Sequence, residues 1–348
     1  MRIFSHSPIY GYLIRNEGEQ LILKDNYGRI IDYLRVSIID WCNLHCIYCQ
    51  YNVVKKTHYE ILKYEEIIRI VQLATQLGIK KVRITGGEPL MRRNIIFFMK
   101  EISQIDGIED LSMTTNGSLL PKYVHLLKEA GLQRLNISLD SLQPKKYEEI
   151  TQGGVLSQIM AGIDEAFKAN FSPIKINVVP MRGINDDELE DFVRLTIKKP
   201  IYVRFIELMP MSNNISYQDI SYQERYIPIS QIKKRLKNTF DLKLVNDVKG
   251  NGPAKYYQID GANGLVGFIS PLSEQICSQC NRLRLTSDGK LRPCLESDTE
   301  IDIKTPLRSG QSDDEIKEVL LSAIKLKPKR HQFTKKRRGL RQMSAIGG

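Results

Sequence analysis

The six cysteines of this chain fall into two groups of three, and the spacing of each group could hold a metal cluster. The first group follows C-x3-C-x2-C and the second C-x2-C-x13-C; the members are Cys42, Cys46 and Cys49, then Cys277, Cys280 and Cys294. Thiolates are soft ligands that hold iron–sulfur clusters, and a four-iron cluster has four corners. Three cysteines therefore leave one iron open in each group, where a further ligand could bind.

Zinc is the alternative metal for either group. It takes four ligands, so the first group would need a histidine such as His45 or His58. His45 lies between two of the cysteines and is equally consistent with a solvent-facing side chain. The second group has no histidine between Cys277 and His331, so zinc would need a distant fourth ligand there. The wide separation of the two groups favours metal ligation over a disulfide framework.

Length and charge narrow the class of protein. At 348 residues with 42% hydrophobic content, the chain can form a large single domain or a core with an extension. It has no run of about 18 apolar residues and no basic-then-apolar start, so we expect a cytoplasmic protein. The net charge of +11 indicates an anionic partner: nucleic acid, a membrane surface or a phosphorylated small molecule. Much of the excess lies in residues 325–341, which could also be a solvated basic segment.

Strands and helices alternate regularly from about residue 25. Apolar patterns predict six strands that alternate with helical periodicity, and six consecutive units of this kind indicate a parallel sheet, doubly wound or curled into part of a barrel. In either arrangement the carboxyl ends of the strands meet on one face of the sheet, and active and ligand-binding sites usually lie on that face. The predicted strands are 34–39, 81–85, 111–115, 134–139, 174–179 and 202–208, and the helices 65–77, 95–105, 122–130, one after Pro144, 158–169 and 186–197.

The pattern changes after Met209, so we divide the chain into three parts. Residues 1–24 carry no motif and stay unassigned, 25–226 form the α/β core, and 227–348 form an extension packed on it. Within the last two parts the sequence predicts a loop at 211–226, helices at 230–237 and 313–325, and strands at 255–259, 265–269 and 283–286.

Two further patterns could carry chemistry. The strand ending at Thr85 runs into Gly86-Gly87-Glu88-Pro89, where glycines allow close backbone approach to a ligand, although an ordinary turn has the same composition. Cations also interrupt the strands, and alternation places two of them on one face beside the second cysteine group. Guanidinium groups match phosphate oxygens well, so together they favour a polyphosphate ligand. Any one of them could instead pair with a carboxylate such as Glu88, Asp140 or Glu207. The cations are Arg35, Lys81, Arg83, Lys175, Arg204, Arg282 and Arg284.

The first cysteine group, with Tyr48 before Cys49, resembles the C-x3-C-x-aromatic-C motif of the radical S-adenosylmethionine (SAM) superfamily. The resemblance implies that SAM binds the open iron and that one electron cleaves it to a 5′-deoxyadenosyl radical. A GGE-P turn against the amino acid part of SAM is a feature of the same superfamily, which implies a SAM contact for Gly87.

The longer set of motifs resembles the GTP 3′,8-cyclase family, which opens molybdenum cofactor biosynthesis. The segments that carry this resemblance include 35–49, 82–93, 114–117, 135–140, 175–179, 204–209, 277–285 and 287–289. It implies a partial (β/α)6 barrel with an α+β extension, one [4Fe–4S] cluster for SAM and a second that holds the guanine of GTP. The implied SAM residues are Tyr48, Gly87, Ser138 and Met209; the implied GTP residues are Arg35, Lys81, Arg83, Thr114, Lys175, Arg282 and Arg284.

The resemblance also implies a reaction and partners. GTP becomes 3′,8-cyclo-7,8-dihydro-GTP, and Arg282 is expected to stabilise the radical intermediate as a catalytic residue. An electron donor such as a flavodoxin or ferredoxin, transfer of the product to cyclic pyranopterin monophosphate synthase, and a homodimer are further expectations. The family's terminal Gly-Gly, here Gly347-Gly348, is expected to reach into the active site.

Two other functions fit parts of the sequence. A radical SAM enzyme with an auxiliary cluster could act on a peptide, although such proteins usually carry more cysteines in the extension. A non-enzymatic zinc or RNA-binding protein could use the basic C-terminal segment, but the chain has no RNP aromatic motif.

Overall fold

The computed structural model describes residues 13–15, 21–49, 57, 59–210, 220–246, 248, 252–274, 276–331, 341 and 343–347. A sheet of twelve strands runs through these residues in the order β14-β13-β12-β3-β4-β5-β6-β7-β8-β11-β10-β9, and β1 and β2 form a separate hairpin. The neighbours from β12 through β11 pair in parallel, whereas β13, β14, β10 and β9 join the two ends antiparallel.

The strands are β1 (Leu13–Arg15), β2 (Leu21–Leu23), β3 (Tyr33–Ser37), β4 (Lys81–Thr85), β5 (Asp110–Thr115), β6 (Arg134–Ser138), β7 (Ile174–Val178), β8 (Ile201–Ile206), β9 (Lys243–Val245), β10 (Lys255–Gln258), β11 (Leu265–Ile269), β12 (Arg282–Leu285), β13 (Lys290–Arg292) and β14 (Ile301–Asp302). The helices are α1 (Tyr64–Gln76), α2 (Ile95–Ser103), α3 (Leu120–Glu129), α4 (Pro144–Thr151), α5 (Leu156–Lys168), α6 (Leu189–Lys198), α7 (Ile220–Arg225), α8 (Ile229–Lys237), α9 (Lys304–Arg308), α10 (Asp313–Lys325) and α11 (Met343–Ile346). Short 3-10 turns lie at η2 (Pro89–Met91), η3 (Asp186–Glu188) and η4 (Ile276–Gln279).

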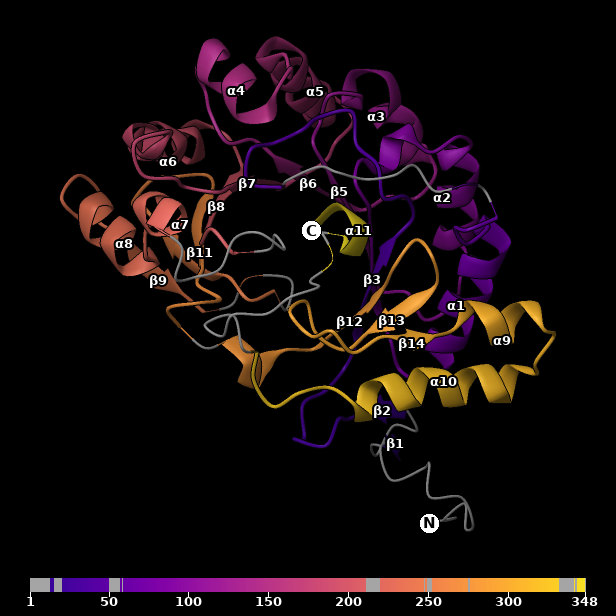
Figure 1. Ribbon diagram of the computed structural model, residues 1–348. Helices are drawn as coiled ribbons and strands as arrows, with labels where there is room; N and C mark the ends of the chain where they lie inside the picture. Colours follow the sequence, from indigo (N-terminus) through magenta and orange to yellow (C-terminus); the bar gives the residue numbers. More distant parts are fainter. Residues whose placement is uncertain are drawn as a thin grey trace.

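The parallel strands curve around a central region, with α1 to α6 outside them and α11 inside (Figure 1). Side-chain alternation explains this layering, because successive residues of a strand point to opposite faces. In β8, Ile201, Val203 and Phe205 belong to the hydrophobic core under the helices, and Tyr202 and Arg204 share the other face. Apolar residues therefore hold the helices on the outside, while the inner face is free to carry polar groups.

All six predicted core strands are present, and the partial barrel with an α+β extension is confirmed. Gly131 ends α3 with a φ of +91°, as expected of a glycine after a helix. The extension is more than a layer packed on the core, because β11 pairs with β8 and β12 pairs with β3 in the same sheet. The boundary between 226 and 227 stays a prediction.

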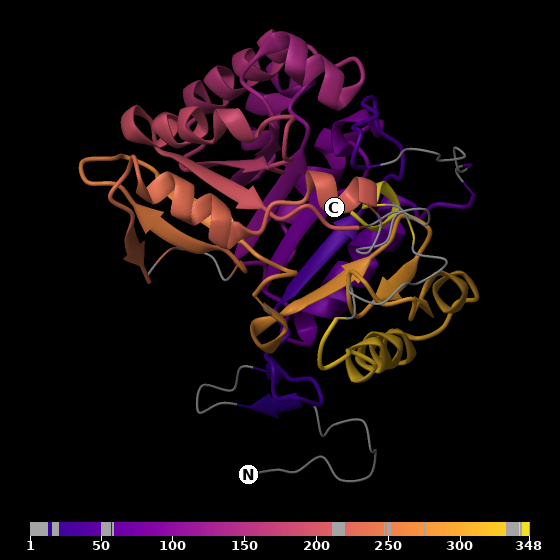
Figure 2. The ribbon, with the colours of Figure 1, turned by 60° about the vertical axis from the view of Figure 1, so that its left-hand side comes forward.

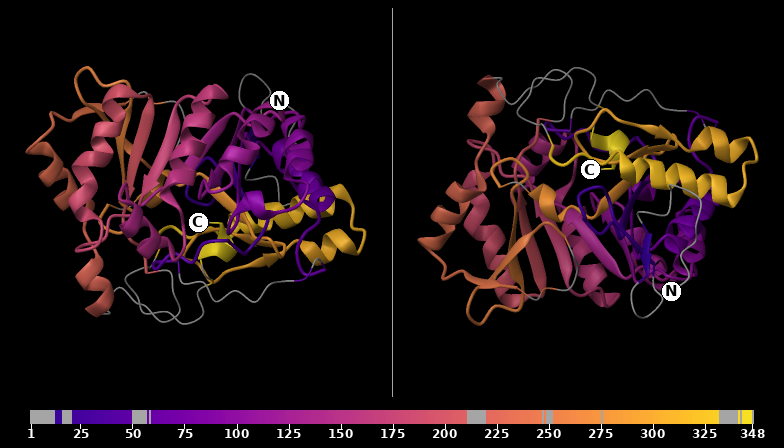
Figure 3. Two further views of the ribbon diagram at one scale, coloured as in Figure 1. Left: turned by 90° about the horizontal axis from the view of Figure 1, so that it is seen from above. Right: turned by 90° about the horizontal axis from the view of Figure 1, so that it is seen from below.

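Two regions differ in detail from the expectation. The hairpin β1–β2 lies in the segment that sequence left unassigned, and Figure 2 shows it far from α11. Helix α7 occupies the end of the predicted loop 211–226, whose first nine residues lie outside the described part of the chain. Both views of Figure 3 place α11 well inside the outline of the molecule.

Polar contacts join the extension to the core, some of them buried and others at the surface. Glu207, directly after β8, accepts hydrogen bonds at Oε1 from Ile229 N (3.1 Å) and at Oε2 from Leu272 N (2.9 Å) and Ser273 N (3.1 Å). On the other side, Arg308 contacts Glu66 of α1 at 2.7 Å. None of the described helices combines the length and apolar character needed to cross a membrane.

Candidate active site

The first cysteine group lies in the loop after β3, and backbone hydrogen bonds fix its shape. Cys49 N donates to Cys46 O over 2.9 Å, and Ile47 N donates to Ile150 O at the end of α4 over 2.9 Å. Cys42 Sγ accepts hydrogen bonds from Leu44 N and from Asn116 Nδ2, both at 3.4 Å. Donors of this kind orient thiolate ligands and tune a cluster. The group therefore fits a four-iron cluster held by its three sulfurs.

The glycine-rich turn after β4 lies directly against this loop. Gly87 N donates to Ile39 O (2.8 Å), and a Cβ on Gly87 would lie 2.3 Å from Trp41 O, so only glycine fits. Glu88 is fully buried and accepts hydrogen bonds from Thr115 Oγ1 (2.8 Å) and Asn116 N (2.7 Å). Burial raises the pKa of Glu88 to about 7. The carboxyl thus connects the turn to Asn116, which contacts Cys42.

The predicted SAM residue Tyr48 contacts Asp140 after β6. Its hydroxyl donates to Asp140 Oδ2 over 2.7 Å, and Val179 N donates to the other carboxylate oxygen over 2.8 Å. Burial raises the pKa of Asp140 to about 6, although both hydrogen bonds act in the opposite direction. Ser138 is two residues before Asp140, and Met209 follows β8 and packs against Ile346. The four predicted SAM residues therefore come from the first loop, the glycine turn and two strand ends.

Three of the predicted GTP cations, which we call the cation row, lie in register on three neighbouring strands. Arg284 of β12 pairs in register with Arg35 of β3, and Arg35 pairs with Arg83 of β4. Burial, together with the neighbouring guanidinium of Arg282, lowers the pKa of Arg284 to about 10. Burial and other cations lower the pKa of Lys175 to about 6. So many like charges in one place need an anionic ligand to stabilise them.

Several of these cations have protein partners as well. Lys81 makes an ion pair with Asp32 at 2.7 Å, a carboxylate that sequence reasoning did not consider. Arg83 Nε donates to Ser112 Oγ over 3.2 Å, and Arg204 Nη2 donates to Asn136 Oδ1 over 2.6 Å. The three carboxylates that sequence analysis offered as partners of the cations are Glu88, Asp140 and Glu207. In the structure they instead accept hydrogen bonds from backbone N–H groups and from hydroxyl groups. Thr114 is in register with Asn136, and its hydroxyl has no hydrogen-bond partner among the described residues.

The second cysteine group lies on both sides of the β12–β13 segment: Cys277 is in η4, Cys280 directly follows η4, and Cys294 follows β13. Cys277 Sγ accepts a hydrogen bond from His331 N, and Cys280 Sγ accepts one from Lys327 Nζ, both at 3.4 Å. Although burial opposes ionisation, the charges of Arg282 and Lys327 lower the pKa of Cys280 to about 6. A soft thiolate set with N–H donors fits an iron–sulfur cluster here as well.

The zinc alternative requires a fourth ligand for each cysteine group. Among the residues that the structure describes, no three His, Cys, Asp or Glu side chains are arranged to hold a single metal ion. His331 approaches the second group through its backbone, and its Nε2 contacts Pro271 O at 2.6 Å.

The C-terminal segment reaches the cation row. Gly347 O accepts a hydrogen bond from Arg284 Nη1 over 3.0 Å. Gly347 has a φ of +69°, and a Cβ there would lie 2.4 Å from Thr85 Cγ2, so the position requires glycine. Ile346 is only 1% exposed and packs against Met209 and Leu272. Gly348 lies outside the described residues.

Sequence reasoning missed several residues of this region. Lys327 was assigned to a basic run that could be solvated, which is wrong for this residue, because its side chain is only 4% exposed. Its ammonium also contacts Arg282 O (2.7 Å) and Pro293 O (2.8 Å). Arg29 donates to Cys277 O over 2.8 Å. Lys327 precedes a proline at the end of a helical pattern, and that helix end was the one available signal.

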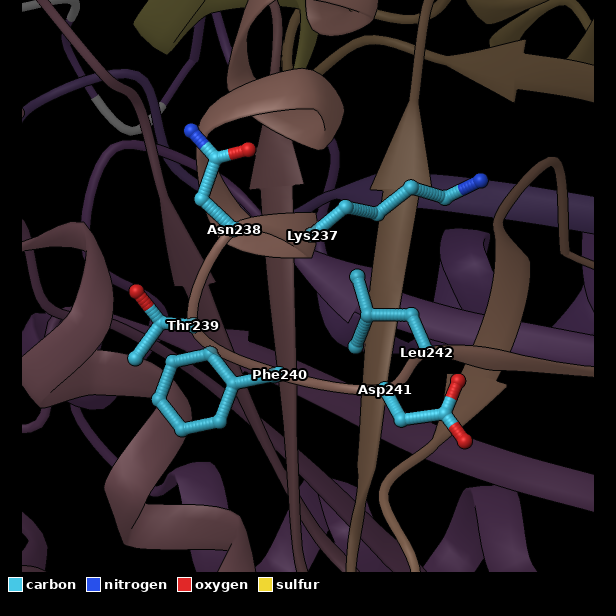
Figure 4. Close-up of a pocket in the computed structure, with 6 residues that line it drawn as sticks. All are labelled: Lys237, Asn238, Thr239, Phe240, Asp241 and Leu242. Atoms are coloured by element: carbon cyan, nitrogen blue, oxygen red, sulfur yellow. The ribbon is translucent and has the colours of Figure 1, made fainter.

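A separate pocket of about 420 Å³ lies at the end of α8, away from these groups (Figure 4). It is lined by six consecutive residues, Lys237, Asn238, Thr239, Phe240, Asp241 and Leu242. None of them is a predicted site residue.

Comparison with known proteins agrees with the geometry. The Radical SAM superfamily model matches residues 36–196, and the Molybdenum Cofactor Synthesis C model matches residues 201–333. The GTP 3′,8-cyclase of Thermodesulfovibrio yellowstonii is 49% identical over 331 residues, which cover 94% of this chain and 100% of the relative. That of Alkaliphilus oremlandii is 50% identical over 330 residues, again 94% and 100% of the two chains.

Solved structures share the fold at low sequence identity. Streptococcus suis SuiB bound to the precursor peptide SuiA superposes with a TM-score of 0.61 and 15% identity, covering 88% of this chain and 66% of that chain. This similarity concerns the fold alone. The two family matches and the near full-length relatives together show that the chain belongs to the GTP 3′,8-cyclase family of radical SAM enzymes.

Proposed function

We propose that this enzyme performs its cyclisation in the space bounded by the two cysteine groups, with GTP on the cation row and SAM beside the first group. The observation that carries the assignment is the in-register row Arg284, Arg35 and Arg83, which begins at the strand following Cys280. Guanidinium groups hold phosphate oxygens through paired hydrogen bonds. We therefore assign the triphosphate to this row and the guanine to the second cluster.

The cofactors supply the bond-breaking chemistry. When bound, a four-iron cluster held by Cys42, Cys46 and Cys49 would supply the electron that cleaves SAM, and SAM would in turn supply the radical that takes hydrogen from GTP. The chain's own residues bind both reactants, orient them and exclude water. Arg282, whose charge lies next to Cys280, is assigned to stabilise the radical intermediate and to contact GTP.

At the SAM end, each assigned residue has a distinct role. The absence of a side chain on Gly87 lets its turn pack against the backbone of Trp41 and Cys42, and we assign the amino acid part of SAM to this turn. Tyr48 is fixed by Asp140, and Asn116 supports Cys42. Ser138 and Met209 are assigned to SAM from the ends of β6 and β8.

At the substrate end, we assign Lys81, Thr114 and Lys175 to GTP, in addition to the in-register arginines of β12, β3 and β4. The unpartnered hydroxyl of Thr114 is free to bond a substrate oxygen or nitrogen. Lys175 shares the inner face with Arg204, and bound phosphate would relieve the repulsion between them. Because Lys81 forms an ion pair with Asp32, its ammonium would contact Asp32 and GTP at the same time.

Anaerobic incubation with GTP, SAM and a reductant tests the assignment. We expect 3′,8-cyclo-7,8-dihydro-GTP and 5′-deoxyadenosine in equal amounts, from a brown protein with about eight irons per chain, as two four-iron clusters require. Release of 5′-deoxyadenosine with a peptide substrate and none with GTP would contradict it. A colourless protein that retains zinc would do the same.

The remaining expectations concern the cell. We propose a cytoplasmic location, because cluster thiolates need a reducing compartment. A flavodoxin or ferredoxin as electron donor, transfer of the product to cyclic pyranopterin monophosphate synthase and a homodimeric state stay predictions.

A further inference from the structure

A partly buried charge cluster, made of Arg341, Asp288 and Glu300, lies just before the C-terminal helix. Arg341 Nη1 contacts both carboxylate oxygens of Asp288 at 2.9 Å, and its Nε and Nη2 contact the two oxygens of Glu300 at 2.7 and 2.8 Å. The three side chains are only 23%, 16% and 21% exposed. One guanidinium therefore binds two carboxylates in a two-pronged geometry, which is stronger and more directional than a surface ion pair.

The two carboxylates are themselves fixed. Asp288 Oδ1 accepts a hydrogen bond from Thr286 Oγ1 over 2.6 Å, and Glu300 Oε1 contacts Arg292, whose side chain is 2% exposed. Asp288 lies in the turn between β12 and β13, and Arg292 ends β13. The partners of Arg341 thus belong to the β12–β13 hairpin and the segment after it.

The same hairpin holds the other end of the tail. Arg284 of β12 donates to Gly347 O, six residues after Arg341. Helix α11 is therefore attached to the hairpin at both ends, with Ile346 packed in between. Ordering the last residues of a chain costs conformational entropy, and chain ends are usually disordered unless they are attached.

We propose that Arg341 is a positioning residue: its contacts with Asp288 and Glu300 hold the tail so that Gly347 stays on Arg284 when GTP reacts. Arg341 is not a catalytic residue, because it acts through the tail. The proposal rests on the proposed function for its kinetic readout. The order of the tail can be measured without any reaction.

Arg341→Gln, Arg341→Lys and Asp288→Asn test the proposal, with Arg194→Gln as a matched control, since Arg194 pairs with Asp191 on the surface. Hydrogen exchange of the C-terminal peptide is measured on the cluster-loaded proteins. We expect exchange at least about tenfold faster in Arg341→Gln and Asp288→Asn, partial recovery in Arg341→Lys, and no change in the control.

Kinetics then separate positioning from stability. At equal iron content and melting temperature, Arg341→Gln should form about tenfold less cyclised product while it still releases 5′-deoxyadenosine, since small positioning errors have effects of this size. Unchanged exchange in Arg341→Gln overturns the attachment of the tail. Faster exchange with unchanged product overturns its role in positioning. Failure of the wild type to cyclise GTP overturns the proposed function, and the exchange result still decides the attachment.

Discussion

Arg284 donates a hydrogen bond from Nη1 to the carbonyl oxygen of Gly347 over 3.0 Å, so an arginine that we assign to GTP also contacts the C-terminal segment inside the barrel. The same arginine is in register with Arg35, so the tail ends on the cation row itself.

Replacing Gly347 with alanine should expel the tail. The φ of +69° disfavours a side chain, and the new Cβ would lie 2.4 Å from Thr85 Cγ2. We expect cyclisation to fall by at least about tenfold, with iron content and SAM cleavage nearly intact, as we expect when both terminal glycines are deleted. Gly183→Ala is the control, because Gly183 has a φ of +68° but open space around its Cβ position. Full cyclisation by Gly347→Ala would show that the tail tolerates displacement.

The two clusters should separate by mutation. Cys46→Ser should abolish reductive cleavage of SAM, because the open iron that binds SAM depends on its three thiolates. Cys280→Ser should keep some uncoupled cleavage and form no cyclised GTP. Both products are measured in one chromatographic assay, with iron content as the control for loading. If Cys280→Ser cyclised GTP at nearly the wild-type rate, the second group would have no role in substrate binding.

GTP binding should take up a proton through Lys175. Burial and neighbouring cations lower the pKa of Lys175 to about 6, so its amine is largely neutral at pH 7.5 in the free enzyme. A bound phosphate raises that pKa and restores the charge, so affinity should increase as the pH falls toward 6. Calorimetry in two buffers of different ionisation enthalpy should give different binding heats for the wild type and equal heats for Lys175→Met.

The control for that measurement is Lys199→Met, since Lys199 pairs with Asp164 at the surface. It should keep the buffer dependence. Equal binding heats in the two buffers for the wild type would place the triphosphate elsewhere.

The loss of one phosphate contact, in Lys175→Ala or Arg83→Ala, should weaken GTP binding by about 1.5–3 kcal/mol.

Lys327→Met should weaken the second cluster. The ammonium contacts Cys280 Sγ, the carbonyl oxygen of Arg282 and the carbonyl oxygen of Pro293, which directly precedes Cys294, so its removal takes away both a charge and a link between the segments that carry Cys280 and Cys294. Iron content should fall from about eight toward about four per chain, with SAM cleavage retained. Lys329→Met is the control, because Lys329 is exposed on the same segment. A normal iron content in Lys327→Met would leave the cluster independent of this contact.

Sequence periodicity predicted the core strands because each has a buried face with regular alternation. Strand β11 matches its predicted range of 265–269, whereas β9, β13 and β14 are two or three residues long and lack a pattern. The ion pair of Lys81 with Asp32 and the buried position of Lys327 could not be predicted, since both depend on residues brought together by the sheet. The spacing of the motifs identified the cysteines and cations of the candidate site, because binding a metal cluster or a phosphate requires particular residue types.

The pairing of β12 with β3 determines how far apart the two reactants can be. Strand β3 leads into the first cysteine group and β12 follows the second, and Arg282 and Leu285 are in register with Tyr33 and Val36. With GTP and SAM placed as proposed, the separation between the hydrogen donor and the radical source is therefore set by a backbone ladder. A hinge motion that moved one cysteine group relative to the other would have to break the hydrogen bonds of that ladder.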